Sequence, residues 1–210
     1  MVAYMKDWTG NTKSAFVTIG SNCHSERDRE KDDFYSTDPK SLEIFLNAIE
    51  RDGIKLHTNI WECACGQGHL SKVLEENGYN VLSTDLVYRG YGIVDIDTDF
   101  LNGKYYTHTK FNGDILTNPP YKYAKEFVEK ALEKIEWGHY VVMFLKIQFL
   151  EGKARRKMFE KSPPKYIYVN SERQLCYMNG DMNNKMSSAT CYCWFIWEKG
   201  FKGDPIVKWI

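Results

Sequence analysis

The sequence contains no uninterrupted run of 18 apolar residues, so it offers no segment of the kind that crosses a membrane as a helix. Its first residues hold no apolar stretch typical of a secretory signal, and we expect a cytoplasmic protein. It also lacks an excess of charge, because 28 Lys and Arg balance 28 Asp and Glu. That balance excludes a polybasic protein that binds nucleic acid through bulk charge.

The six cysteines include no C-x-x-C pair, and no histidine cluster stands at zinc spacing. Four of them form two C-x-C pairs, Cys63 with Cys65 and Cys191 with Cys193, each in an apolar, strand-like run. Alternate residues of a strand share a face, so each pair offers two thiols, whereas a structural zinc needs four ligands. We therefore expect no metal site, and reduced cysteines in the core of a cytosolic protein.

The composition is that of a globular chain. Of 210 residues, 43% are apolar and 27% are charged, and this length corresponds to one domain. We expect residues 1–33 to form a polar N-terminal arm of a single domain that spans residues 1–210.

From residue 40 onward, helix-like and strand-like segments alternate. Apolar residues that recur every three or four positions predict helices at 40–53, 69–76, 123–137 and 152–161. Short apolar runs predict strands at 59–63, 80–84, 114–117, 139–145, 166–169 and 191–197. This alternation indicates an α/β fold with a doubly wound, mostly parallel sheet and helices on both faces. The last two strands have no helix between them and predict an antiparallel pair, an edge hairpin.

Two glycines, Gly66 and Gly68, follow the strand at 59–63. Glycine at a strand-to-helix turn permits positive φ, and its missing Cβ lets a ligand approach the backbone. Asp85 ends the next strand, where a carboxylate can accept hydrogen bonds from a ribose diol. Glu62 would repel a pyrophosphate but suits an α-amino cation. A dinucleotide fingerprint would need a third small residue at Ser71, so a nicotinamide enzyme stays open, as does a turn with a purely geometric role.

The most specific feature is Asn118-Pro119-Pro120-Tyr121, which follows the strand at 114–117. The prolines remove two N–H donors, so the Asn118 side-chain oxygen and the Pro119 carbonyl can converge on one amino group. Two such acceptors would hold an exocyclic amine, and Tyr121 would stack on its ring. The alternative is a Pro-Pro loop that merely ends a buried strand.

The segments ECACGQG (62–68) and DILTNPPY (114–121) resemble the class I S-adenosylmethionine-dependent methyltransferases that act on amino groups, most closely the small DNA adenine-N6 methyltransferases of phages and bacteria. The segments DFYSTDP (33–39) and DFL (99–101) are similar to further parts of that family, and the resemblance spans about residues 24–210. It implies a Rossmann-like, seven-stranded sheet, S-adenosyl-L-methionine as cofactor, and methyl transfer to the exocyclic amino group of a flipped-out adenine in DNA.

The resemblance also implies a role for each matching residue. Cofactor binding would involve Tyr35, Ser36 and Thr37 at the methionine end, Glu62, Cys63, Ala64, Cys65, Gly66 and Gly68 beneath it, Asp85 and Leu86 at the ribose, and Asp99 and Phe100 at the adenine. The catalytic residues Asn118, Pro119, Pro120 and Tyr121 would grip the target base. The sequence departs from the family at Cys63, where Pro is common, and Asp95 and Asp97 compete with Asp99 for its role.

Charge is unevenly distributed along the chain. Residues 146–165 hold seven Lys and Arg but two Glu, whereas residues 24–50 hold eight acidic and four basic residues. The basic helix predicts phosphate contacts, although a solvated helix face has the same composition. The polar run 178–188 is expected to reach a groove. The nucleic-acid contacts predicted are Lys153, Arg155, Arg156, Lys157 and Arg173.

Other functions share parts of this pattern. An RNA adenine-N6 methyltransferase or a protein-glutamine methyltransferase would use the same pocket, and a non-catalytic nucleotide-binding or nucleic-acid-binding module would keep only its shape. We expect no separate target-recognition domain, and therefore low or short-site specificity, or help from a partner chain. The pattern predicts neither the recognition sequence nor the oligomeric state.

Overall fold

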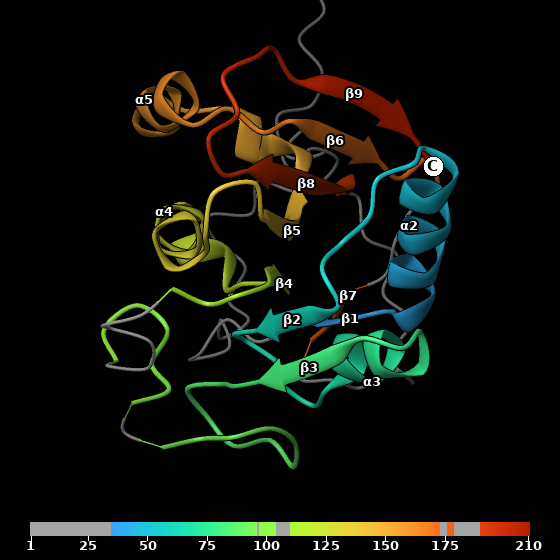
Figure 1. Ribbon diagram of the computed structural model, residues 1–210, viewed down its shortest axis with the longest axis vertical. Helices are drawn as coiled ribbons and strands as arrows, with labels where there is room; N and C mark the ends of the chain where they lie inside the picture. Colours follow the sequence, from blue (N-terminus) through green and yellow to red (C-terminus); the bar gives the residue numbers. More distant parts are fainter. Residues whose placement is uncertain (1–34, 96, 104–109, 173–175, 179–189) are drawn as a thin grey trace, which may run out of the picture.

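The computed structural model describes residues 35–95, 97–103, 110–172, 176–178 and 190–210. Their main feature is a seven-stranded sheet with the strand order β3-β2-β4-β5-β8-β6-β9 (Figure 1). The strands are β2 (Asn59–Glu62), β3 (Asn80–Ser83), β4 (Asp114–Thr117), β5 (Tyr140–Lys146), β6 (Tyr166–Val169), β8 (Tyr192–Glu198) and β9 (Ile206–Trp209).

The sheet is parallel except at β8, which runs antiparallel to both β5 and β6. The predicted mostly parallel, doubly wound sheet with an antiparallel pair of late strands is confirmed. One strand, β9, was not predicted, and it lies beyond β6 at the edge of the sheet. Ile93, in the weakly patterned stretch after β3, forms only an isolated parallel bridge with Thr84.

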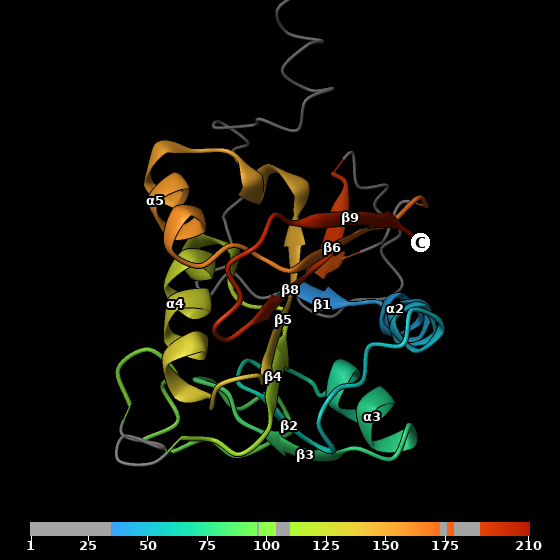
Figure 2. The same cartoon turned by 45° about the horizontal axis from the view of Figure 1, so that its top comes forward.

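Helices cover both faces of the sheet (Figure 2). They are α2 (Pro39–Arg51), α3 (His69–Glu76), α4 (Ala124–Lys134) and α5 (Lys153–Lys161). Helix α2 begins where the sequence dictates: Asp38 accepts a hydrogen bond from the Lys40 backbone N–H at 3.0 Å, and Pro39 occupies the first turn, where its missing N–H costs nothing.

The core has two parts because successive strand residues face opposite sides. On one face, Trp61, Ile115 and Phe195 pack with α4 and with Met158 of α5. On the other face, strand neighbours such as Leu116 pack with α2 and α3. Among the described residues, no helix is long and apolar enough to span a bilayer.

A second, two-stranded sheet consists of β1 (Tyr35–Thr37) and β7 (Cys176–Met178), which pair antiparallel. Neither strand was predicted, since three residues are too few to show a period. The predicted arm 1–33, most of the polar run 178–188 and Arg173 lie outside the described residues.

Candidate active site

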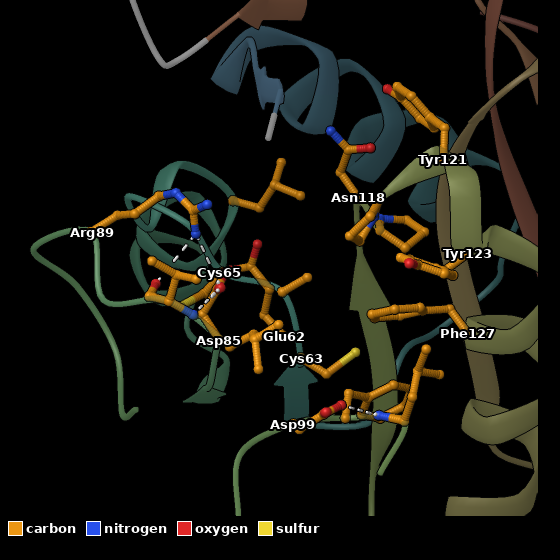
Figure 3. A pocket seen from close by; sticks show the side chains of 18 of the residues that line it. Glu62, Cys63, Cys65, Asp85, Arg89, Asp99, Asn118, Tyr121, Tyr123 and Phe127 are labelled. Carbon is orange, nitrogen blue, oxygen red and sulfur yellow. Dashed lines mark hydrogen bonds and ion pairs between the residues drawn. The ribbon is translucent and has the colours of Figure 1, made fainter. Parts of the chain in front are cut away.

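A cavity of about 570 Å³ lies beyond the carboxyl ends of β2, β3 and β4 (Figure 3). In an open parallel sheet, this edge is where the loops diverge and ligands bind. Its walls come from β1, the turn after β2, the loops after β3 and before β4, and the segment that joins β4 to α4. Residues far apart in the sequence therefore meet around one space.

The turn between β2 and α3 forms the floor. Gly66 and Gly68 have φ values of 54° and 76°, the left-handed region that glycine adopts without strain. The Gly66 N–H donates to Asp85 Oδ2 at 2.8 Å. A Cβ on Gly68 would stand 2.4 Å from the ring of Tyr91, so the turn has no room for a side chain there. The glycines thus fix the path of the chain from Glu62, at the end of β2, into α3.

Glu62 ends β2 and is only 2% exposed, although it lines the cavity. Its carboxyl accepts a hydrogen bond from Ser71 Oγ, which lies 2.7 Å from Ser83 Oγ. Burial raises the pKa of Glu62 to about 8, and the Ser71 hydrogen bond only partly opposes that rise. Glu62 is therefore mostly neutral at pH 7 and gains charge when a cation lies against it.

Asp85, just after β3, is also buried but has more partners. Its Oδ1 accepts from the Val87 N–H at 2.9 Å and from Arg89 Nη1 at 3.2 Å, while Oδ2 accepts from Gly66. A carboxylate has roughly four acceptor positions, so three of them are used. Asp85 can accept one further hydroxyl, or two if Arg89 moves away.

The loop before β4 supplies Asp99 and Phe100. The Asp99 side chain accepts from the backbone N–H groups of Leu101 and Asn102, at 3.0 and 3.1 Å, and fixes this turn. Asp99 lines the cavity, whereas Asp95 and Asp97, the other two candidates for its role, do not. Phe100 lines it too but is 6% exposed, and its ring stacks on Phe127 at 5.1 Å. The Phe100 ring is therefore packed in the core and exposes little of its surface to the cavity.

Asn118 and the residues after it leave β4 directly into the cavity wall. Asn118 Nδ2 donates to Thr37 Oγ1 of β1 at 2.8 Å. The Pro120 carbonyl accepts from the Tyr123 N–H at 2.9 Å, which starts the short 3-10 turn η1 (Tyr121–Tyr123) before α4. The Thr37 contact orients the Asn118 amide from a strand that lies outside the main sheet.

Strand β1 also reaches the other side of the cavity. Ser36 Oγ lies 2.7 Å from Nδ1 of His69, the first residue of α3. Desolvation lowers the pKa of His69 below its ordinary value, so the ring favours its neutral form. Neighbouring residues of β1 thus connect the glycine turn to the segment around Asn118.

The two cysteines of the glycine turn, Cys63 and Cys65, are buried rather than reactive. Burial raises the pKa of Cys65 to about 12 and that of Cys63 well above its ordinary value, so both remain thiols. Cys63, Cys65, Cys191 and Cys193 are free of disulfides. Within the described ranges, no three His, Cys, Asp or Glu residues converge on a position that would hold a metal ion.

Fourteen of the predicted site residues line the cavity: Ser36, Thr37, Glu62, Cys63, Ala64, Cys65, Asp85, Leu86, Asp99, Phe100, Asn118, Pro119, Pro120 and Tyr121. Gly66 and Gly68 shape the turn beneath it without lining it, and Tyr35 lies in β1. Ten further residues were not predicted: Gln67, His69, Leu70, Val87, Arg89, Leu101, Asn102, Lys122, Tyr123 and Phe127. Five of them, Gln67, His69, Val87, Leu101 and Lys122, directly adjoin a predicted residue, which is the signal that would have found them.

The predicted phosphate contacts on α5 do not line the cavity. Arg155 donates to the Glu151 carbonyl and lies over the Phe149 ring at 5.2 Å, and Arg156 pairs with Glu160 at 2.8 Å. Helix α5 follows the 3-10 turn η2 (Ile147–Leu150) at the end of β5, so its first turn lies at the same edge of the sheet as the cavity. Lys153 and Lys157 belong to the same helix.

No protein-family profile matches the sequence, and no curated protein is similar to it. Solved structures do share its fold at low identity. A protein from Listeria monocytogenes assigned to the class I S-adenosylmethionine-dependent methyltransferases matches with a TM-score of 0.56 and 13% identity, over 94% of this chain and 70% of that one. A protein from Pyrococcus horikoshii assigned as an RNA methyltransferase matches with a TM-score of 0.53 and 12% identity, over 90% of this chain and 100% of that one.

A third similar structure is the methyltransferase subunit of a type I restriction-modification system from Streptococcus thermophilus. Its TM-score is 0.59 at 15% identity, over 83% of this chain and 47% of that subunit, so this chain spans about half the length of that protein. At these identities the likeness concerns the fold. The chain has the fold of the class I S-adenosylmethionine-dependent methyltransferases.

Proposed function

We propose that this protein transfers a methyl group from S-adenosyl-L-methionine to the exocyclic amino group of adenine in DNA. The observation that carries the proposal is the position of residues 118–121, which line the same cavity as the carboxyls of Glu62 and Asp85. Figure 3 shows Asn118 and Tyr121 facing that cavity from the side opposite Asp85 and Arg89. A cofactor side and a substrate side therefore share one space.

The residues present fit this cofactor by their chemistry. Glu62 offers a carboxyl that ionises beside an α-amino cation, and Asp85 has an acceptor position left for a ribose hydroxyl. Leu86, with Asp99 and Phe100, offers apolar surface and a carboxyl edge for the adenine. Bound there, the cofactor would supply an electrophilic methyl group on a sulfonium.

The chain's own residues would hold and orient the amine. The Asn118 side-chain oxygen and the Pro119 carbonyl accept hydrogen bonds from its two N–H groups, which draws the nitrogen lone pair away from the ring and toward the incoming methyl group. Thr37 keeps the Asn118 amide from rotating, because it accepts from Nδ2. Tyr121 stacks on the base. No side chain is needed as a base, since proximity and alignment dominate attack on a sulfonium and the proton leaves to water.

The test is methyl transfer by the purified protein from labelled S-adenosylmethionine to duplex DNA, RNA and protein, with each acceptor separated afterwards. We expect label in DNA. Asn118→Ala should lower the rate by about two orders of magnitude, the usual loss when one positioned polar contact to a transition state is removed. Asn112→Ala, an exposed change in the loop before β4, serves as the matched control and should leave the rate unchanged.

The outcomes separate the candidate functions. Label found only in protein would overturn the proposal and favour a glutamine acceptor. Cofactor binding without transfer to any acceptor would favour a non-catalytic module. RNA is the second candidate, because the fold match to the Pyrococcus horikoshii protein covers that whole chain. Label found only in RNA would establish it.

The wider setting belongs to the same proposal. The fold match to a restriction-modification methyltransferase subunit supports a DNA substrate. We expect low or short-site specificity unless a partner chain adds contacts. The free cysteines, Cys63, Cys65, Cys191 and Cys193, are consistent with a cytoplasmic protein.

A further inference from the structure

Two lysines lie beside the tyrosines that follow Asn118. Lys122 Nζ is 5.1 Å from the centroid of the Tyr123 ring, and Lys146 Nζ is 4.9 Å from the centroid of the Tyr121 ring. Lys122 belongs to η1, after β4, and Lys146 is the last residue of the adjacent strand β5. Two ammonium groups, one from the turn after β4 and one from the end of β5, therefore approach the segment that would grip the base.

Cationic side chains lie on both sides of the cavity. Its described lining holds two cationic side chains, Arg89 and Lys122. Arg89 pairs with Asp85 on the cofactor side. Lys122 is exposed and lies on the side of Tyr121, with Lys146 nearby. Positive charge on the substrate side therefore comes from these two lysines rather than from α5.

A ring under an ammonium group restricts the position of that group, because the ring quadrupole attracts it. Tyr123 is 43% exposed, so Lys122 is held at the surface of the protein and not inside it. A flipped-out base enters a pocket while the phosphates on either side of its nucleotide remain outside. Two restrained cations beside the base-gripping segment match two phosphates in number and in sign.

We propose that Lys122 and Lys146 contact the two phosphates that flank the target nucleotide. This inference rests on the proposed function, because it assumes a polynucleotide substrate. It places the inner part of the nucleic-acid interface at the ends of β4 and β5, and it leaves any contact with α5 as an outer part.

The experiment measures binding separately from catalysis. A short fluorescent duplex with one mismatched adenine, which costs less to flip, is titrated with the full-length protein between about 50 and 200 mM salt. Lys122→Gln and Lys146→Gln should each weaken binding about tenfold at the lower salt and reduce the slope of log affinity against log salt by about one. Lys125→Gln is the matched control, since Lys125 lies one turn further on and pairs with Glu129 at 2.7 Å.

Cofactor binding and melting temperature are measured for each variant, and both should match the wild type. An unchanged salt slope in both lysine variants would overturn the inference, as would equal losses in Lys125→Gln or a wild-type protein that does not bind the duplex. If the wild type binds with the expected slope but transfers no methyl group, the proposed function fails while the phosphate contacts stand. If the wild type methylates DNA and the variants keep its salt slope, the proposed function stands and the phosphate contacts fail.

Discussion

Burial sets the charge of Glu62, the carboxyl at the end of β2. Its pKa is about 8 in the folded protein and about 4.5 in an unfolded chain, mainly because the charged form is desolvated. Between these two values the folded protein binds more protons than the unfolded one. Stability must therefore fall as the pH rises through this window and level off above it. Burying Glu62 at the site therefore provides a carboxyl for a cationic ligand but lowers the free energy of unfolding of the ligand-free protein at high pH.

Glu62→Gln tests this cost. The amide stays uncharged at every pH, so the melting temperature of the variant minus that of the wild type should be larger at about pH 8 than at about pH 5. Thermal melts at the two pH values measure the difference. Glu76→Gln, an exposed change at the other end of α3, should show no such trend. The same offset at both pH values in Glu62→Gln would mean that Glu62 is charged in the folded protein.

Among the elements, helices and inner strands follow from the sequence because their apolar residues face a core at a regular period. Helix α3, for example, is predicted at 69–76 and found at His69–Glu76. Strand β9 escapes prediction because three of its four residues are exposed and show no alternation. At the site, the glycine turn and residues 118–121 stand out as short motifs. The Thr37–Asn118 and Ser36–His69 contacts do not, since tertiary folding alone brings β1 to them.

The turn between β2 and α3 makes a second test. Gly53 and Gly68 have similar positive φ values, 72° and 76°, but a Cβ on Gly53 meets nothing within 4 Å while one on Gly68 meets the Tyr91 ring. Gly53→Ala should cost about 1 kcal/mol from backbone strain alone. Gly68→Ala should cost about 2–3 kcal/mol, because strain and overpacking add. Moving the ring also breaks the 2.9 Å hydrogen bond that the Tyr91 hydroxyl donates to the Glu75 carboxylate.

Urea unfolding of the two variants provides the comparison, since each differs from the wild type by one methyl group. In the double variant Gly68→Ala/Tyr91→Ala, measured against Tyr91→Ala, the cost should return to the Gly53→Ala value. Equal costs in the two single variants would show that the ring is not a barrier.

Over the whole molecule, the balanced net charge conceals a strongly basic helix, α5. Helix α5 carries Lys153, Arg155, Arg156, Lys157 and Lys161, and its first turn lies at the edge of the sheet where the cavity opens. The opposite face of the sheet is covered by α2 and α3. A polynucleotide that places one base in the cavity would meet α5 farther along its backbone.

Reversing three of these charges, Arg155→Glu, Arg156→Glu and Lys157→Glu, should lower duplex affinity and flatten its salt dependence at equal cofactor affinity. The control reverses Lys40, Lys55 and Lys72, three exposed lysines on the side of α2 and α3, and should have a smaller effect for the same change in net charge. Binding titrations at several salt concentrations measure both. Equal losses of affinity in the two triple variants would mean that α5 acts only through the net charge of the protein.

The pairing of β1 with β7 also bears on the order in which the protein is made. During synthesis β1 leaves the ribosome before the main sheet, yet its partner strand β7 leaves only after five of the seven main-sheet strands, β2 to β6. The strand that orients Asn118 must therefore wait, unpaired, while the glycine turn and residues 118–121 are already made. Long-range pairing of this kind forms late, because the closure of a long loop has to come first. A finished cavity is thus a property of the nearly complete chain, and nascent fragments that end before β7 should carry the motifs without the site.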